Sequence, residues 1–144
     1  MKNYSAQCFR GCSDTGTYHH IWWSCPKALT FWTEIFNIAS ILTKKKIPLD
    51  LKTALLNLKP DNITHMHFKL LSQLFTAEKQ TLAKAWKSPN LIVNEVKEIM
   101  NNSMTYAKMT AIDTDMITEF ERIWKPWITY AMPISFNNEV LMPW

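Results

Sequence analysis

The sequence predicts a mostly α-helical protein, with a small N-terminal zinc knuckle followed by a bundle of about four helices. Three observations lead to this prediction. All three cysteines and both glycines lie within residues 1–25. Beyond residue 25, apolar side chains recur at intervals of three and four residues, the period of an amphipathic helix. No segment there has the alternation of a β-strand, so we expect any β structure only in hairpin-like turns of the knuckle.

The first helix is expected over residues 26–43. Pro26 suits the first turn of a helix, and one face carries Leu29, Trp32, Ile35, Phe36, Ala39 and Leu42. Lysines 44–46 follow, where positive charge meets the negative end of the helix dipole, and Pro48 opposes continuation. We interpret these lysines as a solvated helix end, and contact with phosphate is the alternative.

Two further helices are expected in the middle of the chain. A short helical turn over residues 50–56 has Asp50 as its N-cap, and the turn sequence at 59–62 follows it. A long helix is expected over residues 64–87. Its apolar stripe consists of Phe68, Leu71, Phe75, Leu82 and Trp86.

The last two helices are expected over residues 91–108 and after Asp113, which can cap the second of them. Pro126 is expected to kink this last helix or to end it near Lys125.

The chain has 144 residues, enough for one domain. We divide it into a zinc-knuckle segment (1–25), a helical segment (26–130) and an irregular tail (131–144).

Composition excludes several classes of protein. Two glycines are too few for the glycine-rich loops that bind dinucleotides or phosphates. No apolar run approaches the roughly 18 residues of a membrane-spanning helix, and the first residues lack the apolar stretch of a secretory signal. We therefore expect an intracellular protein, cytoplasmic or nuclear. The formal net charge of +4 permits an anionic partner.

The residues with the clearest chemistry are Cys8, Cys12, His20 and Cys25. Their spacing, Cys-x3-Cys-x7-His-x4-Cys, offers zinc three thiolates and one imidazole in a reducing compartment. His19 is the competing ligand. The alternatives are that the cysteines are small buried apolar residues, or that a cysteine and a histidine form a nucleophile. We expect no catalysis, because no orienting group or oxyanion loop can be identified.

Aromatic and basic residues adjoin the proposed ligands. An exposed Trp22 or Trp23 could stack on an unpaired base, while Arg10 and Lys27 attract phosphate. The alternative is that both indoles belong to the core, which is the commoner fate of aromatic residues in small domains.

Three segments of the chain together resemble a known family. They are Cys8-Phe-Arg-Gly-Cys12, the run from Gly16 to Pro26 that contains His20 and Trp22-Trp23, and Phe31-Trp32. They are similar to the C-terminal cysteine-rich segment of the endonuclease–reverse transcriptase of LINE-class non-LTR retrotransposons. Later segments, 74–77, 83–89 and 96–100, resemble the helical continuation of that segment. The resemblance selects His20 over His19 as the zinc ligand. Phe9 stands where the family often has Trp.

The resemblance implies a role in holding template RNA, but no polymerase or endonuclease motif occurs in these residues. We therefore expect a zinc-binding, non-catalytic RNA-binding module, a fragment of a retrotransposon polyprotein without its catalytic domains. The expected partner is single-stranded RNA or another nucleic acid, with neither a membrane nor a small-molecule substrate. The alternatives are a zinc-stapled helical module with a structural or protein-interaction role, and a remnant without selected function.

Overall fold

The computed structural model of the chain describes residue 8, residues 17–84 and residues 93–131. Within these ranges it contains helices and no strands, so the mostly-α prediction is confirmed. A π-helical turn, η2 (His20–Ser24), precedes the helices α1 (Pro26–Thr43), α2 (Leu51–Leu56), α3 (His65–Lys84), α4 (Val93–Asp113) and α5 (Ile117–Ala131).

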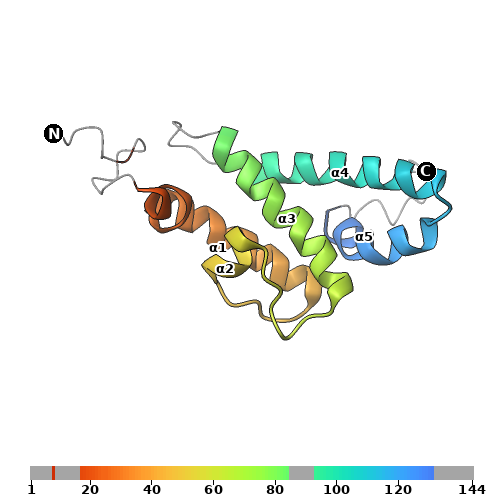
Figure 1. Ribbon diagram of the computed structural model, residues 1–144, viewed down its shortest axis with the longest axis horizontal. Helices are drawn as coiled ribbons and strands as arrows, with labels where there is room; N and C mark the ends of the chain where they lie inside the picture. The colour runs from red at the N-terminus through yellow and green to blue at the C-terminus, as the bar shows by residue number, and fades with distance from the viewer. Residues whose placement is uncertain (1–7, 9–16, 85–92, 132–144) are drawn as a thin grey trace.

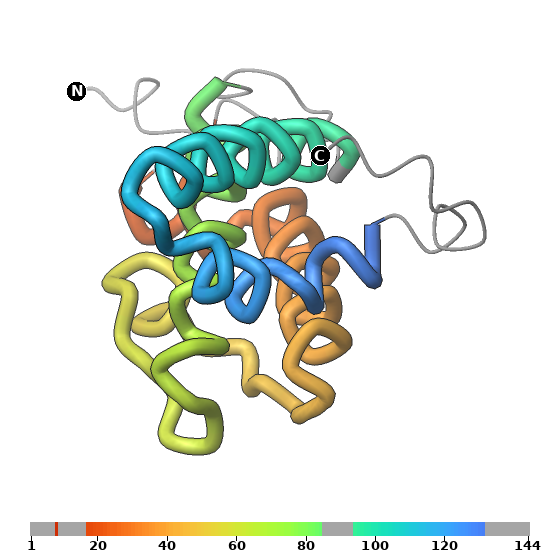
Figure 2. The backbone as a smooth tube through the Cα atoms, turned by 90° about the vertical axis from the view of Figure 1, so that its right-hand side faces the viewer, coloured from red at the N-terminus to blue at the C-terminus, as the bar shows by residue number. Residues whose placement is uncertain are grey.

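Helix α3 is the centre of the bundle. It contacts α1, α2, α4 and α5, and in Figure 1 it runs obliquely between α1 on one side and α4 and α5 on the other. Seen from the end of the molecule, α4 lies across the bundle above α1, α3 and α5 (Figure 2). The other helices therefore cover most of α3, which explains why its apolar stripe is as wide as the sequence indicates. One face of α3, with Lys69, Gln73 and Gln80, remains exposed.

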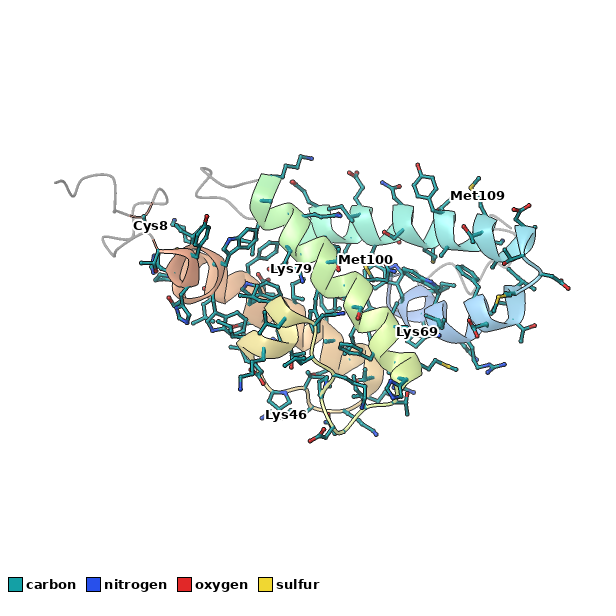
Figure 3. The ribbon with its side chains drawn as sticks, viewed as in Figure 1. Cys8, Lys46, Lys69, Lys79, Met100 and Met109 are labelled. Atoms are coloured by element: carbon teal, nitrogen blue, oxygen red, sulfur yellow. The ribbon has the colours of Figure 1, made fainter. Side chains whose placement is uncertain are left out.

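The core between α1 and α3 is aromatic. The rings of Phe36 and Phe75 stack with their centroids 5.0 Å apart, and Trp32 packs against both at 6.3 Å. Between α3 and α4, Met100 is fully buried, whereas Met109 points away from the bundle (Figure 3). These contacts join α1, α3 and α4 in one core, which also includes the buried residues Ile21 and Cys25 from the segment before α1.

The first helices begin and end where the sequence indicates. Helix α1 has the predicted limits, and it closes at Lys44, whose backbone is left-handed (φ 57°). The carboxylate of Asp50 accepts a hydrogen bond from the Lys52 N–H at 3.0 Å, as expected of the N-cap of α2. Thr64 caps α3 by accepting from the His67 N–H at 3.2 Å. The predicted end of α3 lies outside the described residues.

Helix α4 is longer than predicted. It continues five residues past 108 because Lys108 and Ala111 carry on the buried stripe that includes Met104. Asp113 is therefore the last residue of α4 and not the cap of α5. The turn that follows places Asp115 in the left-handed conformation (φ 61°), and the Met116 N–H bonds to the Ala111 carbonyl at 2.7 Å.

Helix α5 does not end near Lys125. It passes through Pro126 and ends at Ala131. Proline removes one helical hydrogen bond, but Trp127 and Ile128 are buried beyond it, and the Trp127 Nε1–H donates to Asn101 Oδ1 of α4 at 2.9 Å. This burial offsets the cost of the missing bond.

None of the helices in the described ranges combines the length and apolar character that a membrane span requires.

Candidate metal centre

Three of the four predicted ligands lie together at the N-terminal end of α1. The ligand atoms of Cys8, His20 and Cys25 all lie within 4.8 Å of one another, and all three residues are buried. Figure 3 shows Cys8 at this end of the molecule, remote from α4 and α5. Buried thiols and an imidazole converging on one point can hold a metal ion.

The two sulfur atoms are not bonded to each other. Cys8 Sγ and Cys25 Sγ are 3.8 Å apart, whereas a disulfide needs about 2.05 Å. Their separation suits two ligands of one metal ion.

The π-helical turn brings His20 and Cys25 together. The Cys25 N–H donates to the His20 carbonyl at 2.7 Å, so one backbone bond joins the two ligand residues. The turn begins where the Thr17 hydroxyl accepts from the His20 N–H at 3.2 Å. Cys25 then adopts an extended conformation (ψ 130°), which the following Pro26 favours, and α1 starts. A π turn closes its hydrogen bond over five residues, one more than an α-helix does. His20 and Cys25, which are five residues apart, therefore lie on the same side of the turn.

The neighbouring His19 faces elsewhere. It is exposed, and its Nδ1 lies 3.3 Å from the Ser24 hydroxyl. Successive residues of a helical turn point about 100° apart, so only one of the two histidines can face the cysteines. The structure places His20 there.

The other predicted site residues differ in their surroundings. Cys12 and Arg10 lie outside the described residues. Lys27 is exposed, and Trp22 and Trp23 are both half-buried. The Trp23 ring packs on Trp32 and Phe36, with centroids 5.7 and 6.3 Å away, so it belongs largely to the core.

Sequence reasoning did not identify two residues that position the centre. One is Thr17, whose hydroxyl accepts a hydrogen bond from the His20 N–H at 3.2 Å. The other is Trp32, whose Nε1–H donates to the Trp22 carbonyl at 2.8 Å and so ties the π turn to α1. The signal for Thr17 was its position three residues before His20, which is the spacing of an N-cap. The hydrogen bond of Trp32 had no sequence signal.

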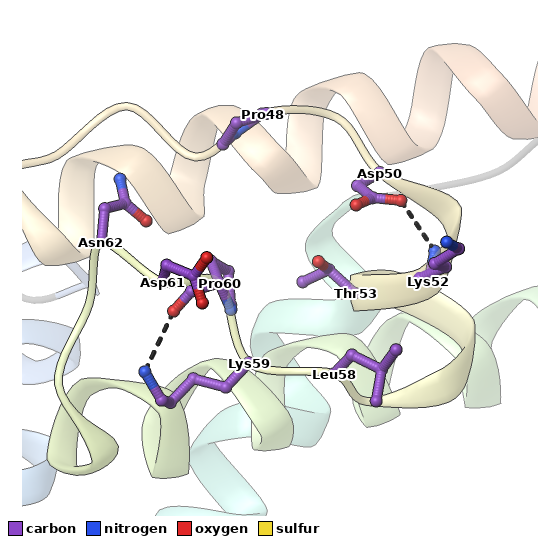
Figure 4. A pocket seen from close by; sticks show the side chains of 9 residues that line it. All are labelled: Pro48, Asp50, Lys52, Thr53, Leu58, Lys59, Pro60, Asp61 and Asn62. Carbon is purple, nitrogen blue, oxygen red and sulfur yellow. Dashed lines mark hydrogen bonds between the residues drawn. The ribbon is translucent and has the colours of Figure 1, made fainter.

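Apart from this cluster, a hollow of about 390 Å³ lies in the connection around α2 (Figure 4). Two of the charged side chains that line this hollow form hydrogen bonds within the connection. The Lys59 Nζ donates to the carbonyls of Pro60 and Ile63 at 3.1 and 2.9 Å, and Asp50 caps α2. These bonds stabilise the connection between α1 and α3.

A scan of the chain against models of known protein families finds no matching family.

Proposed function

We propose that this chain is a zinc-dependent, non-catalytic module that binds single-stranded RNA. The observation that carries the zinc is the buried cluster of Cys8, His20 and Cys25. Two thiolates, each about 2.3 Å from a tetrahedral zinc ion, are about 3.8 Å apart. The two sulfur atoms of the cluster have this separation, 3.8 Å.

In this proposal Cys12 is the fourth ligand, on the strength of its spacing from Cys8 and of the resemblance to the retrotransposon segment. Four protein ligands leave no open position for water or substrate, so such a site is structural. The zinc would fasten the N-terminal segment to the start of α1.

RNA binding is proposed from the surface beside this centre. Lys27 is exposed and Trp22 is half-buried. Tyr18, two residues before the π turn, is 82% exposed. Exposed aromatic rings stack on unpaired bases with about 1–3 kcal/mol per base, while cations attract the backbone. The net charge of +4 and the resemblance to an RNA-contacting segment support the same partner.

A second candidate function is a structural or protein-interaction module in which zinc only staples helices. The packing of Trp23 on Trp32 and Phe36 favours it, since this indole is used in the core. The two candidates differ in their response to salt. Phosphate contacts weaken steeply as salt rises, whereas an apolar docking surface hardly responds.

The test is fluorescence anisotropy of a labelled single-stranded RNA with the zinc-loaded and the chelated protein, over a series of salt concentrations. We expect zinc-dependent binding whose logarithm falls by about 0.7 per phosphate contact for each tenfold rise in salt. Tyr18→Ala should weaken binding, whereas Tyr106→Ala on α4 should not, although Tyr106 is also 70% exposed. Absence of binding, or binding insensitive to salt, would contradict the proposal.

A further inference from the structure

A second hollow, of about 440 Å³, lies at the opposite end of α1 from the metal centre. Three helices meet there: the end of α1, the start of α3 and one face of α5 (Figure 1). Helix α1 has 18 residues, so at about 1.5 Å per residue the hollow lies about 27 Å along it from Cys25. A volume of this size accommodates a small ligand.

Positive charge dominates the lining. Lys44, Arg122 and Lys125 line the hollow, and none of the lining residues is acidic. Within the described part of the chain, the side chains of these three cations make no hydrogen bond or ion pair. Glu121, the neighbour of Arg122, interacts with Lys108 of α4. Three positive charges therefore share one hollow in a chain whose formal net charge is +4.

Uncharged polar groups and aromatic rings complete the lining. His67 forms part of the wall, and its buried Nδ1 has no hydrogen-bond partner among the described residues. Thr129 and Tyr130 lie on the α5 side. The Nζ of Lys97, from α4, sits 5.5 Å from the centre of the Tyr130 ring and adds a fourth cation nearby.

The continuation of α5 through Pro126 creates this arrangement. Arg122, Pro126 and Thr129 are four and three residues apart, so they share a helix face only because the helix does not end at Lys125. The end of α1, where lysines 44–46 follow the helix, lies beside this face of α5. Of these three lysines, Lys44 lines the hollow.

We infer that this hollow is a binding site for a phosphate group. Arginine and lysine are the side chains that recognise phosphate, arginine through paired N–H donors and lysine as a compact charge. The inference rests in part on the proposed function, because the backbone of a bound RNA is one source of that phosphate. A free nucleotide is the other.

The test compares two double variants that each lower the formal net charge from +4 to +2. R122A/K125A removes two cations from the hollow. K52A/K84A removes two exposed lysines that lie outside it. Both are used as zinc-loaded, full-length proteins, with circular dichroism as the check on folding.

In the RNA arm, labelled single-stranded RNA is titrated at several salt concentrations. Loss of two phosphate contacts should reduce the salt slope by about 1.4 and weaken binding roughly 25-fold at 0.1 M salt. The control pair should leave the slope unchanged. In the nucleotide arm, a nucleoside monophosphate is titrated by ¹H–¹⁵N NMR, and shifts at residues 122–130 that vanish in R122A/K125A identify a free nucleotide as a ligand.

The inference is overturned if neither arm distinguishes R122A/K125A from K52A/K84A. Failure of the proposed function has a different signature, since the wild-type zinc-loaded protein would then bind no RNA. The nucleotide arm still decides on the hollow in that case, because it requires no RNA.

Discussion

Two adjacent histidines show what can be decided at the level of single residues. Sequence spacing favoured His20 with His19 as the competing ligand, and the resemblance selected His20. In the structure His20 is 6% exposed and lies with the cysteines, whereas His19 is exposed. Spacing could not make this choice, because it depends on a π turn, and a π turn has no recognisable sequence signal.

The two histidines provide a matched pair of variants. His20→Ala should weaken zinc binding at least tenfold, because it removes a ligand, and His19→Ala should leave it unchanged. Competition with a chromophoric chelator measures both affinities. Equal effects of the two variants, or a larger effect of His19→Ala, would contradict the assignment.

Glu78 is a buried acid in the middle of α3. It is fully buried, and neither carboxyl oxygen has a hydrogen-bond partner in the described part of the chain. Burial, with a smaller contribution from Glu34, raises its pKa from 4.5 to about 9. Its position could have been read from the sequence, since residue 78 lies between Phe75 and Leu82 on the buried stripe.

The raised pKa makes stability depend on pH. Between pH 4.5 and about 9 the unfolded chain has lost the Glu78 proton and the folded chain keeps it. The free energy of unfolding should therefore fall as pH rises through this window, by up to about 1.4 kcal/mol per pH unit. Glu78→Gln should flatten this dependence.

Urea unfolding at pH 5, 7 and 8.5 measures the effect. Glu98→Gln, at an exposed position of α4, serves as the control and should retain the wild-type dependence. An unchanged pH profile in Glu78→Gln would show that this carboxyl group does not titrate as its burial requires.

At the level of elements, local signals predicted the limits of α1 and α2 and the start of α3, but not the ends of α4 and α5 or the cap of α5. Asp50, Thr64 and Pro26 act at the first turn of a helix, where side-chain chemistry is local. The ends of α4 and α5 depend on burial against other helices instead. Ala111, Trp127 and Ile128 are buried by tertiary packing, which extends both helices past the predicted limits.

Pro126 allows a direct test of this explanation. If burial maintains α5 against the cost of proline, Pro126→Ala should retain the helix and stabilise the protein by about 1–3 kcal/mol. Urea unfolding and far-ultraviolet circular dichroism measure stability and helix content. Thr118→Ala, at an exposed position of the same helix, controls for the change to alanine. Loss of helix in Pro126→Ala would contradict the explanation.

At the level of the whole molecule, the candidate metal centre lies at one end of the helical bundle. The core of Trp32, Phe36 and Phe75 lies between α1 and α3, whereas the metal centre involves the π turn and the start of α1. The sequence indicated this division through the confinement of all cysteines to residues 1–25. It could not indicate the hollow between α1, α3 and α5, because that hollow requires the tertiary arrangement.

If the cluster binds zinc as proposed, its removal should loosen mainly this end of the molecule. We expect a chelator to lower the thermal midpoint, because a ligand that binds only the folded state stabilises it, while most of the helical circular dichroism at 20 °C remains. Complete loss of helical signal on chelation would contradict this expectation.

The metal content of the protein is the measurement to make first, by native and denaturing mass spectrometry of reduced wild-type protein and of Cys25→Ser. We expect one zinc ion per wild-type chain and none in Cys25→Ser. A wild-type chain that is helical but holds no metal, or a Cys25→Ser variant that keeps its zinc, would contradict the assignment of Cys8, Cys12, His20 and Cys25 as a zinc site.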